Sequence, residues 1–139
     1  MLYISRHQKG LGSNCLSREG MLCVAKMASK IAHSLELSKT VYTCPPATCK
    51  HMRPIQTATN LCTFLDDHTE VQICIDIETM KHLASDSANH LVIWHHGDIS
   101  RLVNQVTSRT FRFSWPEHNF SGCLLLGRHF INFVPEFWY

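Results

Sequence analysis

The sequence predicts an α/β protein of three layers, α/β/α, with a largely parallel central sheet and an antiparallel edge. Two observations predict it: short apolar segments alternate with amphipathic helical segments over residues 2–106, and two further apolar segments then follow without a helix between them. Strands that alternate with helices form parallel sheets whose faces the helices cover. The chain has 139 residues, of which 45% are hydrophobic and 17% charged. We therefore expect one globular domain over residues 1–139.

The first elements are a strand, a helix and a second strand. Leu2–Ile4 is a short apolar run that predicts a buried strand. After a polar loop, Ser17 is a suitable N-cap for a helix, with Glu19 in the first turn. Apolar residues at three- and four-residue steps predict this helix; they are Met21, Val24, Ala25, Ala28, Ile31, Ala32 and Leu35. Val41–Cys44 predicts a second strand, which ends at a pair of prolines.

The middle of the chain predicts another helix and strand. Ile55, Ala58, Leu61, Cys62 and Leu65 have helical spacing, and Pro54 suits a first turn, so Arg53 should lie at the helix start. Apolar residues then alternate with polar ones from Val71 to Ile77, which predicts a strand. A short helical or irregular segment should occupy residues 78–89.

The last elements complete the sheet. Leu91–Trp94 predicts a fourth buried strand. Asp98 can cap the helix that follows it, and we expect it to act as that cap. Cys123–Leu126 and Phe130–Val134 predict edge strands.

Basic residues follow two of the predicted strands and begin one helix. Arg6 and His7 come after the first strand, Arg53 begins a helix, and His96 with Gly97 comes after the fourth strand. Ligands of open α/β sheets bind beyond the carboxyl ends of the strands, so these side chains should meet in one crevice. Guanidinium groups bind phosphate oxygens in a bidentate manner. A neutral imidazole can attack phosphorus and hold the phosphoryl group covalently.

Three segments resemble motifs of the histidine phosphatase superfamily, whose members are phosphoglycerate-mutase-like. Residues 2–7 (LYISRH), with Asn14, Leu16, Ser17 and Gly20, resemble the opening "RH(G)…N..LS..G" signature. Residues 41–45 (VYTCP) and 53–58 (RPIQTA) resemble the "SP…RA.QTA" segment, and residues 91–99 (LVIWHHGDI) resemble the closing "W.HG.I" strand. The three segments occur in the family's order.

The resemblance implies a role for each matching residue. His7 is the phosphorylated nucleophile, and Arg6, Arg53 and His96 form the phosphate pocket. Asn14 is an additional ligand of a phosphate oxygen. We expect the backbone N–H groups after Gly97, at a helix N-terminus, to add donors. Gln8 stands where the family has Gly, and we expect its side chain to be tolerated.

The proton donor is the part of the site that the sequence leaves open. Larger members of the family carry an inserted segment with an acidic donor, and the stretch from Ala58 to Leu91 is too short to hold one. Asp76 or Glu78, at the end of the third predicted strand, could reach the leaving oxygen. Without the insertion we expect a shallow, open pocket, which suits a bulky or protein-borne phosphate.

His95 and His96 compete for one place in the pocket. Adjacent residues of a strand point to opposite faces, so we expect only one of them to join it. The register of the His-Gly-Asp-Ile segment favours His96.

The activity that these residues predict is a metal-independent phosphatase with no cofactor. Two alternatives remain: a phosphate-recognition module that lacks turnover, and a phosphomutase, which needs a closed site that excludes water. Cys44, Cys49 and His51 have no second pair of ligands, so a zinc site is not predicted.

The expected partner is a phosphorylated substrate, either a small molecule or a phosphoprotein. The net charge is only +2 and no basic run occurs, which argues against nucleic acid, and no apolar stretch is long enough to span a membrane. The seven cysteines are scattered and no signal peptide opens the chain. We therefore expect free thiols and a cytoplasmic location.

Overall fold

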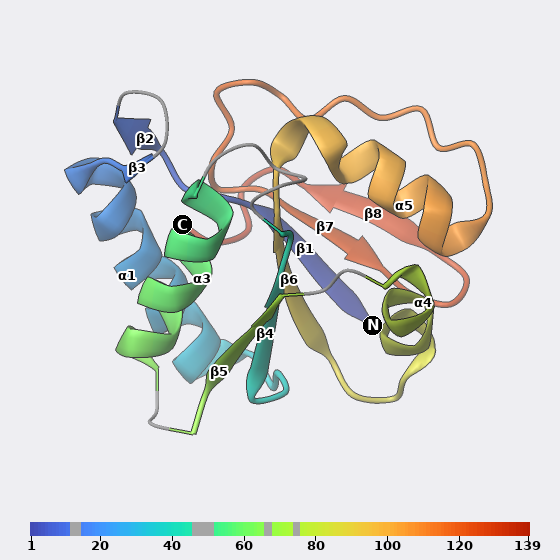
Figure 1. Ribbon diagram of the computed structural model, residues 1–139, viewed down its shortest axis with the longest axis horizontal. Coiled ribbons are helices and arrows are strands. Elements are labelled where there is room, and N and C mark those ends of the chain that lie inside the picture. The colour runs from blue at the N-terminus through green and yellow to red at the C-terminus, as the bar shows by residue number, and fades with distance from the viewer. Residues whose placement is uncertain (12–14, 46–51, 66–67, 74–75) are drawn as a thin grey trace.

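The computed structural model describes residues 1–11, 15–45, 52–65, 68–73 and 76–139. A six-stranded sheet has the strand order β5-β4-β6-β1-β7-β8 (Figure 1). Neighbouring strands are parallel from β5 to β1, and β7 and β8 are antiparallel. The strands are β1 (Leu2–Arg6), β4 (Thr40–Thr43), β5 (Glu70–Ile73), β6 (His90–Trp94), β7 (Cys123–Leu126) and β8 (Ile131–Val134); β2 (Gly10–Leu11) and β3 (Cys15–Leu16) form a separate pair.

Helices cover both faces of this sheet, so the predicted three-layer α/β/α architecture is confirmed (Figure 1). The helices are α1 (Arg18–Ser34), α3 (Arg53–Phe64), α4 (Ile77–Ser85) and α5 (Ile99–Thr107), with a 3-10 turn η1 (His96–Asp98) before α5. Leu2 and Ile4 face the core under α4 and α5, whereas Leu91 and Ile93 face the core under α1 and α3. Val92 and Trp94 of β6 belong to the first of these cores, so β6 divides its apolar side chains between the two, as expected of a strand buried on both faces.

The start of α1 is built around the backbone of Lys9. The Ser17 hydroxyl caps the helix by accepting from the Gly20 N–H at 3.0 Å, as predicted, and it donates to the Lys9 carbonyl at 2.9 Å. A Cβ at Gly20 would lie 2.2 Å from that carbonyl oxygen. Only glycine lets the Lys9 carbonyl come this close to the first turn of α1. The segment after His7 is therefore packed against the start of this helix.

Two boundaries differ from the sequence prediction. The alternation from Val71 to Ile77 predicted one strand, but β5 ends at Ile73, and Ile77 begins α4. Asp76 stops any continuation of the strand because its carboxylate caps α4 by accepting from the Glu78 N–H at 3.0 Å. Asp98 is not the predicted side-chain cap of α5, since its carboxylate instead faces Arg101 at 3.4 Å and Nδ1 of His95 at 3.6 Å.

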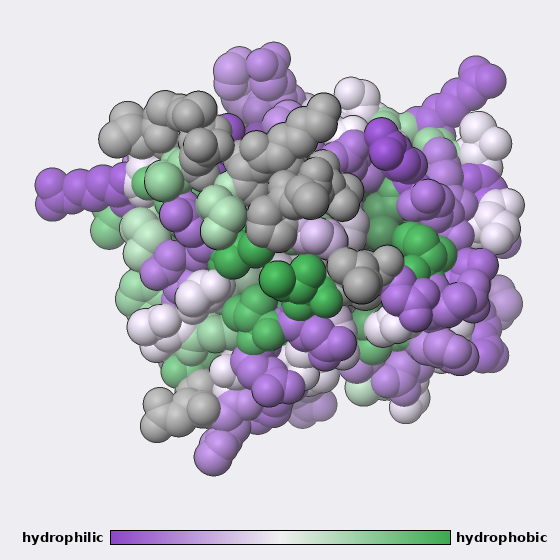
Figure 2. Space-filling model, in the orientation of Figure 1, coloured by the Kyte–Doolittle hydropathy of each residue, from purple (hydrophilic) through white to green (hydrophobic). Residues whose placement is uncertain are grey.

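On the face that Figure 2 shows, the most continuous group of hydrophobic residues lies near the centre, over β4 and β5. Ile73 of the edge strand β5 is 47% exposed. Among the described residues, no helix has the length and apolar character needed to cross a membrane.

The cysteines only partly follow the expectation of free thiols. Cys15, Cys23, Cys62 and Cys123 are free, whereas Cys44 takes part in a disulfide bond. The sulfur of Cys44 is therefore not available as a zinc ligand, and Cys49 and His51 lie outside the described residues. The cytoplasmic location stays a prediction.

Candidate functional site

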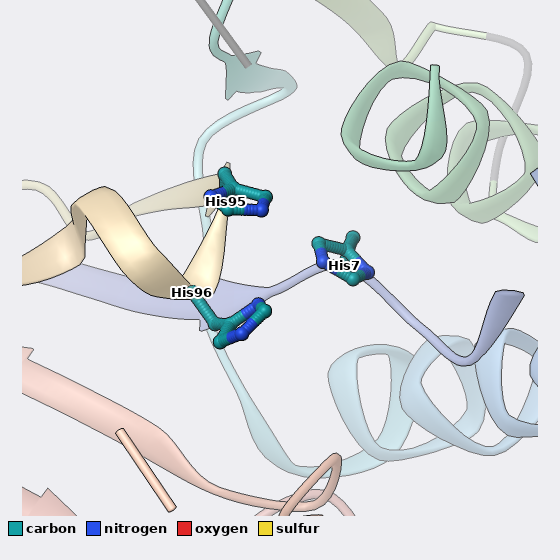
Figure 3. Close-up of side chains that lie close together, drawn as sticks. All are labelled: His7, His95 and His96. Atoms are coloured by element: carbon teal, nitrogen blue, oxygen red, sulfur yellow. The ribbon is translucent and has the colours of Figure 1, made fainter. Parts of the chain in front are cut away.

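The pairing of β1 with β6 brings two basic segments together at the carboxyl ends of these strands. Arg6 is the register partner of Trp94, so His7 emerges beside His95 and His96. The rings of all three histidines turn toward one another (Figure 3). The ring centroid of His7 lies 5.6 Å from that of His96 and 5.7 Å from that of His95. One nitrogen of each ring lies within 4.8 Å of the other two.

His7 is held in one protonation pattern by the chain that follows it. Its Nδ1 lies 2.9 Å from the Gln8 carbonyl oxygen. Because a carbonyl can only accept, Nδ1 carries the hydrogen, and in the neutral ring Nε2 then carries the lone pair. The Gln8 N–H donates to the Thr57 hydroxyl at 3.0 Å, which fixes this turn against α3. The His7 side chain has no exposed surface, so the chain around it holds the ring in place. The shallow, open pocket stays a prediction.

Arg6 is buried and is fixed by a segment more than a hundred residues away in the chain. Its Nη1 donates to the carbonyls of Glu117 at 2.7 Å and Asn119 at 3.3 Å. Its guanidinium carbon lies 4.0 Å from the centre of the Phe120 ring, a cation–π contact. Burial, and then the neighbouring charge of Arg53, lowers the pKa of Arg6 to about 10. The group is therefore charged at neutral pH.

Arg6 also determines the protonation of His96. Its Nη2 lies 3.2 Å from Nδ1 of His96. A guanidinium can only donate, so Nδ1 of His96 accepts, and the hydrogen of the neutral ring lies on Nε2. The two imidazoles are thus complementary: His7 presents a lone pair and His96 presents an N–H.

Arg53, the first residue of α3, adds the second guanidinium. Its positive charge lowers the pKa values of both Arg6 and His95, so it lies close to both side chains. The side chain passes over Gly10, where a Cβ would lie 2.5 Å from Cδ of Arg53 and 3.0 Å from its Nε and Nη1. Gly10 therefore makes room for Arg53.

Gly10→Ala is expected to weaken phosphate binding without unfolding the protein. The colliding atoms belong to a flexible side chain, so Arg53 should shift rather than the backbone. A displaced guanidinium loses part of a charge-assisted hydrogen bond, which corresponds to roughly a tenfold higher Kd for inorganic phosphate. Isothermal titration with phosphate measures this change, and the thermal unfolding midpoint shows whether the fold is kept.

The matched control is Gly127→Ala, because a Cβ there would also meet only a side chain, at 2.4 Å from Phe130. This variant should bind phosphate like the unmodified protein. In an Arg53→Ala background, Gly10→Ala should have no further effect on phosphate binding. Additive losses would show that Gly10 does not act through Arg53.

Comparison with known structures identifies the fold. No protein-family model matches the sequence, and no curated protein sequence matches it significantly. Among solved structures, the chain is similar to a protein from Agrobacterium tumefaciens described as the phosphohistidine phosphatase SixA, with a TM-score of 0.56 and 14% identity over 96% of both chains. It is also similar to a phosphoglycerate mutase from Plasmodium falciparum, with a TM-score of 0.53 and 13% identity over 96% of this chain and 86% of the other. The chain has the histidine phosphatase fold. The predicted resemblance is confirmed at the level of the fold.

Within this histidine phosphatase fold, the prediction that only one of His95 and His96 joins the pocket is wrong. Strand β6 ends at Trp94, and η1 begins at His96. The alternation of a strand therefore no longer applies, and both rings contact His7 (Figure 3). The sequence prediction ended the strand at Trp94, as the structure does, but applied the alternation of a strand to the two residues that follow it.

Asp76, Glu78 and Gly97 are the remaining predicted site residues that the structure describes. Asp76 and Glu78 are exposed and are used by α4 itself: Asp76 caps the helix, and Glu78 forms an ion pair with Lys81 at 3.3 Å. Their role as proton donor stays a prediction. Gly97 lies in η1, directly before α5, and Asn14 lies outside the described residues.

Three residues that hold the site were not predicted: Glu117, Asn119 and Phe120. Two of them contribute backbone carbonyls to Arg6, for which a sequence carries no signal. Gln8, which replaces the family's Gly, turns its side chain away from His7. It donates to the Phe120 carbonyl at 3.0 Å and accepts from the Tyr139 hydroxyl at 3.1 Å.

The charges of the site decide which kind of ligand it favours. Three imidazoles this close resemble the donor set that binds zinc. However, the guanidinium groups of Arg6 and Arg53 lie beside them and would repel a cation. Nδ1 of His96 is also occupied by Arg6. The site therefore favours an oxyanion.

Proposed function

We propose that this chain is a metal-independent phosphatase that hydrolyses a phosphate monoester through a phosphohistidine on His7. In this proposal Arg6, Arg53 and His96 bind the phosphoryl oxygens, and the backbone after Gly97 adds N–H donors. Asn14 is proposed as a further ligand of the phosphate.

The observation that carries the proposal is the complementary protonation of His7 and His96. The hydrogen bond from Nδ1 of His7 to the Gln8 carbonyl leaves Nε2 with the lone pair that a nucleophile needs. The hydrogen bond from Arg6 to Nδ1 of His96 leaves an N–H to donate to a phosphoryl oxygen. One imidazole is therefore suited to attack phosphorus, and the other to stabilise the charge that develops on the oxygens.

The positive charges explain how the reaction proceeds without a metal ion. In phosphoryl transfer, charge builds up on the three equatorial oxygens, and fixed cationic donors stabilise it. Two buried or half-buried guanidinium groups supply such donors. They need no reorganisation, because Arg6 is already fixed by the carbonyls of Glu117 and Asn119.

The substrate is proposed to be phosphorylated, either a small molecule or a protein. The similar structure from Agrobacterium tumefaciens is described as a phosphohistidine phosphatase, which supports a test of protein-borne phosphate. The similar structure from Plasmodium falciparum is a phosphoglycerate mutase, so mutase activity is the alternative to exclude.

Turnover of p-nitrophenyl phosphate in the presence of EDTA tests the proposal. We expect hydrolysis that EDTA leaves unchanged and that vanadate inhibits, because vanadate resembles pentacovalent phosphorus. A panel of phosphopeptides, phosphohistidine, sugar phosphates and 3-phosphoglycerate primed with its bisphosphate then separates the substrate classes. Tight binding of phosphate or tungstate without hydrolysis from mildly acidic to neutral pH would instead indicate a recognition module.

A further inference from the structure

We infer that His95, oriented by Asp98, is the proton donor for the leaving group and the base for the second step. This inference rests on the proposed function. It assigns the role that the sequence left open, and it gives that role to an imidazole instead of a carboxylate of α4.

The position of His95 suits a group that meets the leaving atom. Its ring stacks beside that of His7, with 23° between the ring planes, and one of its nitrogens lies within 4.8 Å of a His7 nitrogen. In an in-line attack the leaving atom lies beyond phosphorus, about 5 Å from the attacking nitrogen. A ring nitrogen of His95 can therefore reach that atom. The side chain is 25% exposed, so a leaving group can depart past it to solvent.

Asp98 orients the His95 ring. Its Oδ2 lies 3.6 Å from Nδ1 of His95, within ion-pair distance. A carboxylate that faces Nδ1 favours a hydrogen on that nitrogen, so Nε2 is the position where a proton is gained and lost. Gly97 leaves space for this arrangement, because a Cβ there would lie 3.1 Å from Cε1 of His95.

The charges around His95 couple its protonation to phosphate binding. Burial is the largest influence on the pKa of His95 and lowers it. The charge of Asp98 raises this pKa, whereas the charges of Arg53 and Arg6 lower it. The rings of His7 and His96 also face it. The lowered pKa favours the neutral ring in the free protein. A bound phosphate adds negative charge beside the ring, which raises the pKa, so binding should be accompanied by proton uptake.

The two steps then balance in protons and bonds. In the first, Nε2 of His7 forms a bond to phosphorus while the bond from phosphorus to the leaving oxygen breaks. The electron pair stays on that oxygen, which takes the proton from Nε2 of His95, and an alcohol departs. In the second, neutral His95 takes a proton from water as the water oxygen attacks phosphorus. The phosphorus–nitrogen bond breaks, phosphate leaves and His95 is protonated again.

The carboxylates on α4 are occupied locally. Asp76 accepts hydrogen bonds from the Glu78 N–H and from the Thr79 hydroxyl, at 3.0 and 3.4 Å. Glu78 pairs with Lys81. Both side chains are exposed to solvent.

The dependence on the leaving group tests the inference. An alkyl phosphate, such as a phosphoserine peptide, needs a proton on its leaving oxygen, whereas p-nitrophenyl phosphate has a good leaving group. With EDTA present, His95→Gln should lower kcat/KM for the phosphoserine peptide by about 10²- to 10⁴-fold, and for p-nitrophenyl phosphate by less than about tenfold. His96→Ala should lower both, because it acts on the phosphoryl oxygens. Asp76→Asn and Glu78→Gln are the competing acid variants, and the selective loss should not occur in either.

Asp98 is a positioning residue, and its test is a pH profile. Because Asp98 raises the pKa of His95, Asp98→Asn should lower that pKa. The alkaline limb of kcat for the phosphoserine peptide should therefore move to lower pH. A purely structural role would lower the rate equally at every pH.

The outcomes separate this inference from the proposed function. Absence of turnover in the unmodified protein would overturn both. Turnover that depends on His7 but falls equally for both substrates in His95→Gln, or a selective loss in Asp76→Asn or Glu78→Gln, would overturn the role of His95 alone. Vanadate titrated in two buffers of different ionisation enthalpy gives a further readout: the unmodified protein should take up a proton, and His95→Gln should not. Equal uptake would contradict the coupling.

Discussion

His7→Ala is expected to abolish hydrolysis of p-nitrophenyl phosphate, lowering kcat/KM by about 10⁴-fold or more, as is typical when a covalent nucleophile is removed. The reason is specific to Nε2 of His7. Its lone pair is set by the bond from Nδ1 to the Gln8 carbonyl, so no other side chain replaces it in the same geometry. Brief incubation with labelled substrate followed by a denaturing quench should trap an acid-labile, alkali-stable phosphohistidine in the unmodified protein only.

Two further variants make this result decisive. His7 is fully buried, so alanine also leaves a cavity, and His7→Gln keeps more of the volume. Both variants should lose turnover while the unfolding midpoint of His7→Gln stays close to that of the unmodified protein. His33→Ala, at the exposed end of α1, is the control and should keep activity and labelling. Full activity in His7→Gln would end the phosphohistidine proposal.

Most of the fold could be predicted because the helices and the strands of the main sheet carry local patterns, whereas the short pair β2–β3 lies in a segment predicted as a polar loop. Apolar residues at helical spacing with the Ser17 cap predicted α1, and the buried run before His95 predicted β6. One exception is the boundary between β5 and α4, where Ile77 continued the strand alternation by coincidence. The capping hydrogen bond of Asp76 decides that boundary. Short-range competition of this kind is where periodicity is least reliable.

The site could be predicted only in part. Its own residues lie in recognisable sequence motifs, but the residues that hold them in place do not. Arg6, His7 and His96 were predicted to meet, and the pairing of β1 with β6 brings them within contact distance. The contribution of His95 was missed because alternation was applied beyond the last residue of β6. The hydrogen bonds that fix Arg6 could not be predicted, since their acceptors are backbone carbonyls of the segment that precedes β7.

Because the Arg6 guanidinium makes several hydrogen bonds at once, Arg6→Lys is the second variant with a large expected effect. We expect kcat/KM for p-nitrophenyl phosphate to fall by about 10²- to 10³-fold, the usual effect of losing one preorganised donor to the transition state. A lysine keeps the charge but has one nitrogen. It cannot donate to the Glu117 carbonyl, bind Nδ1 of His96 and contact phosphate at the same time.

The consequence for His96 separates this explanation from a simple loss of charge. Without the donor at its Nδ1, His96 can adopt the other neutral tautomer, in which Nε2 no longer carries the hydrogen that the phosphoryl oxygen needs. In a His96→Ala background, Arg6→Lys should therefore cost much less than it does alone. Arg109→Lys, at an exposed position, is the control and should keep full activity. Fully additive losses would mean that Arg6 acts on phosphate alone, and that the hydrogen bond to His96 does not set its protonation.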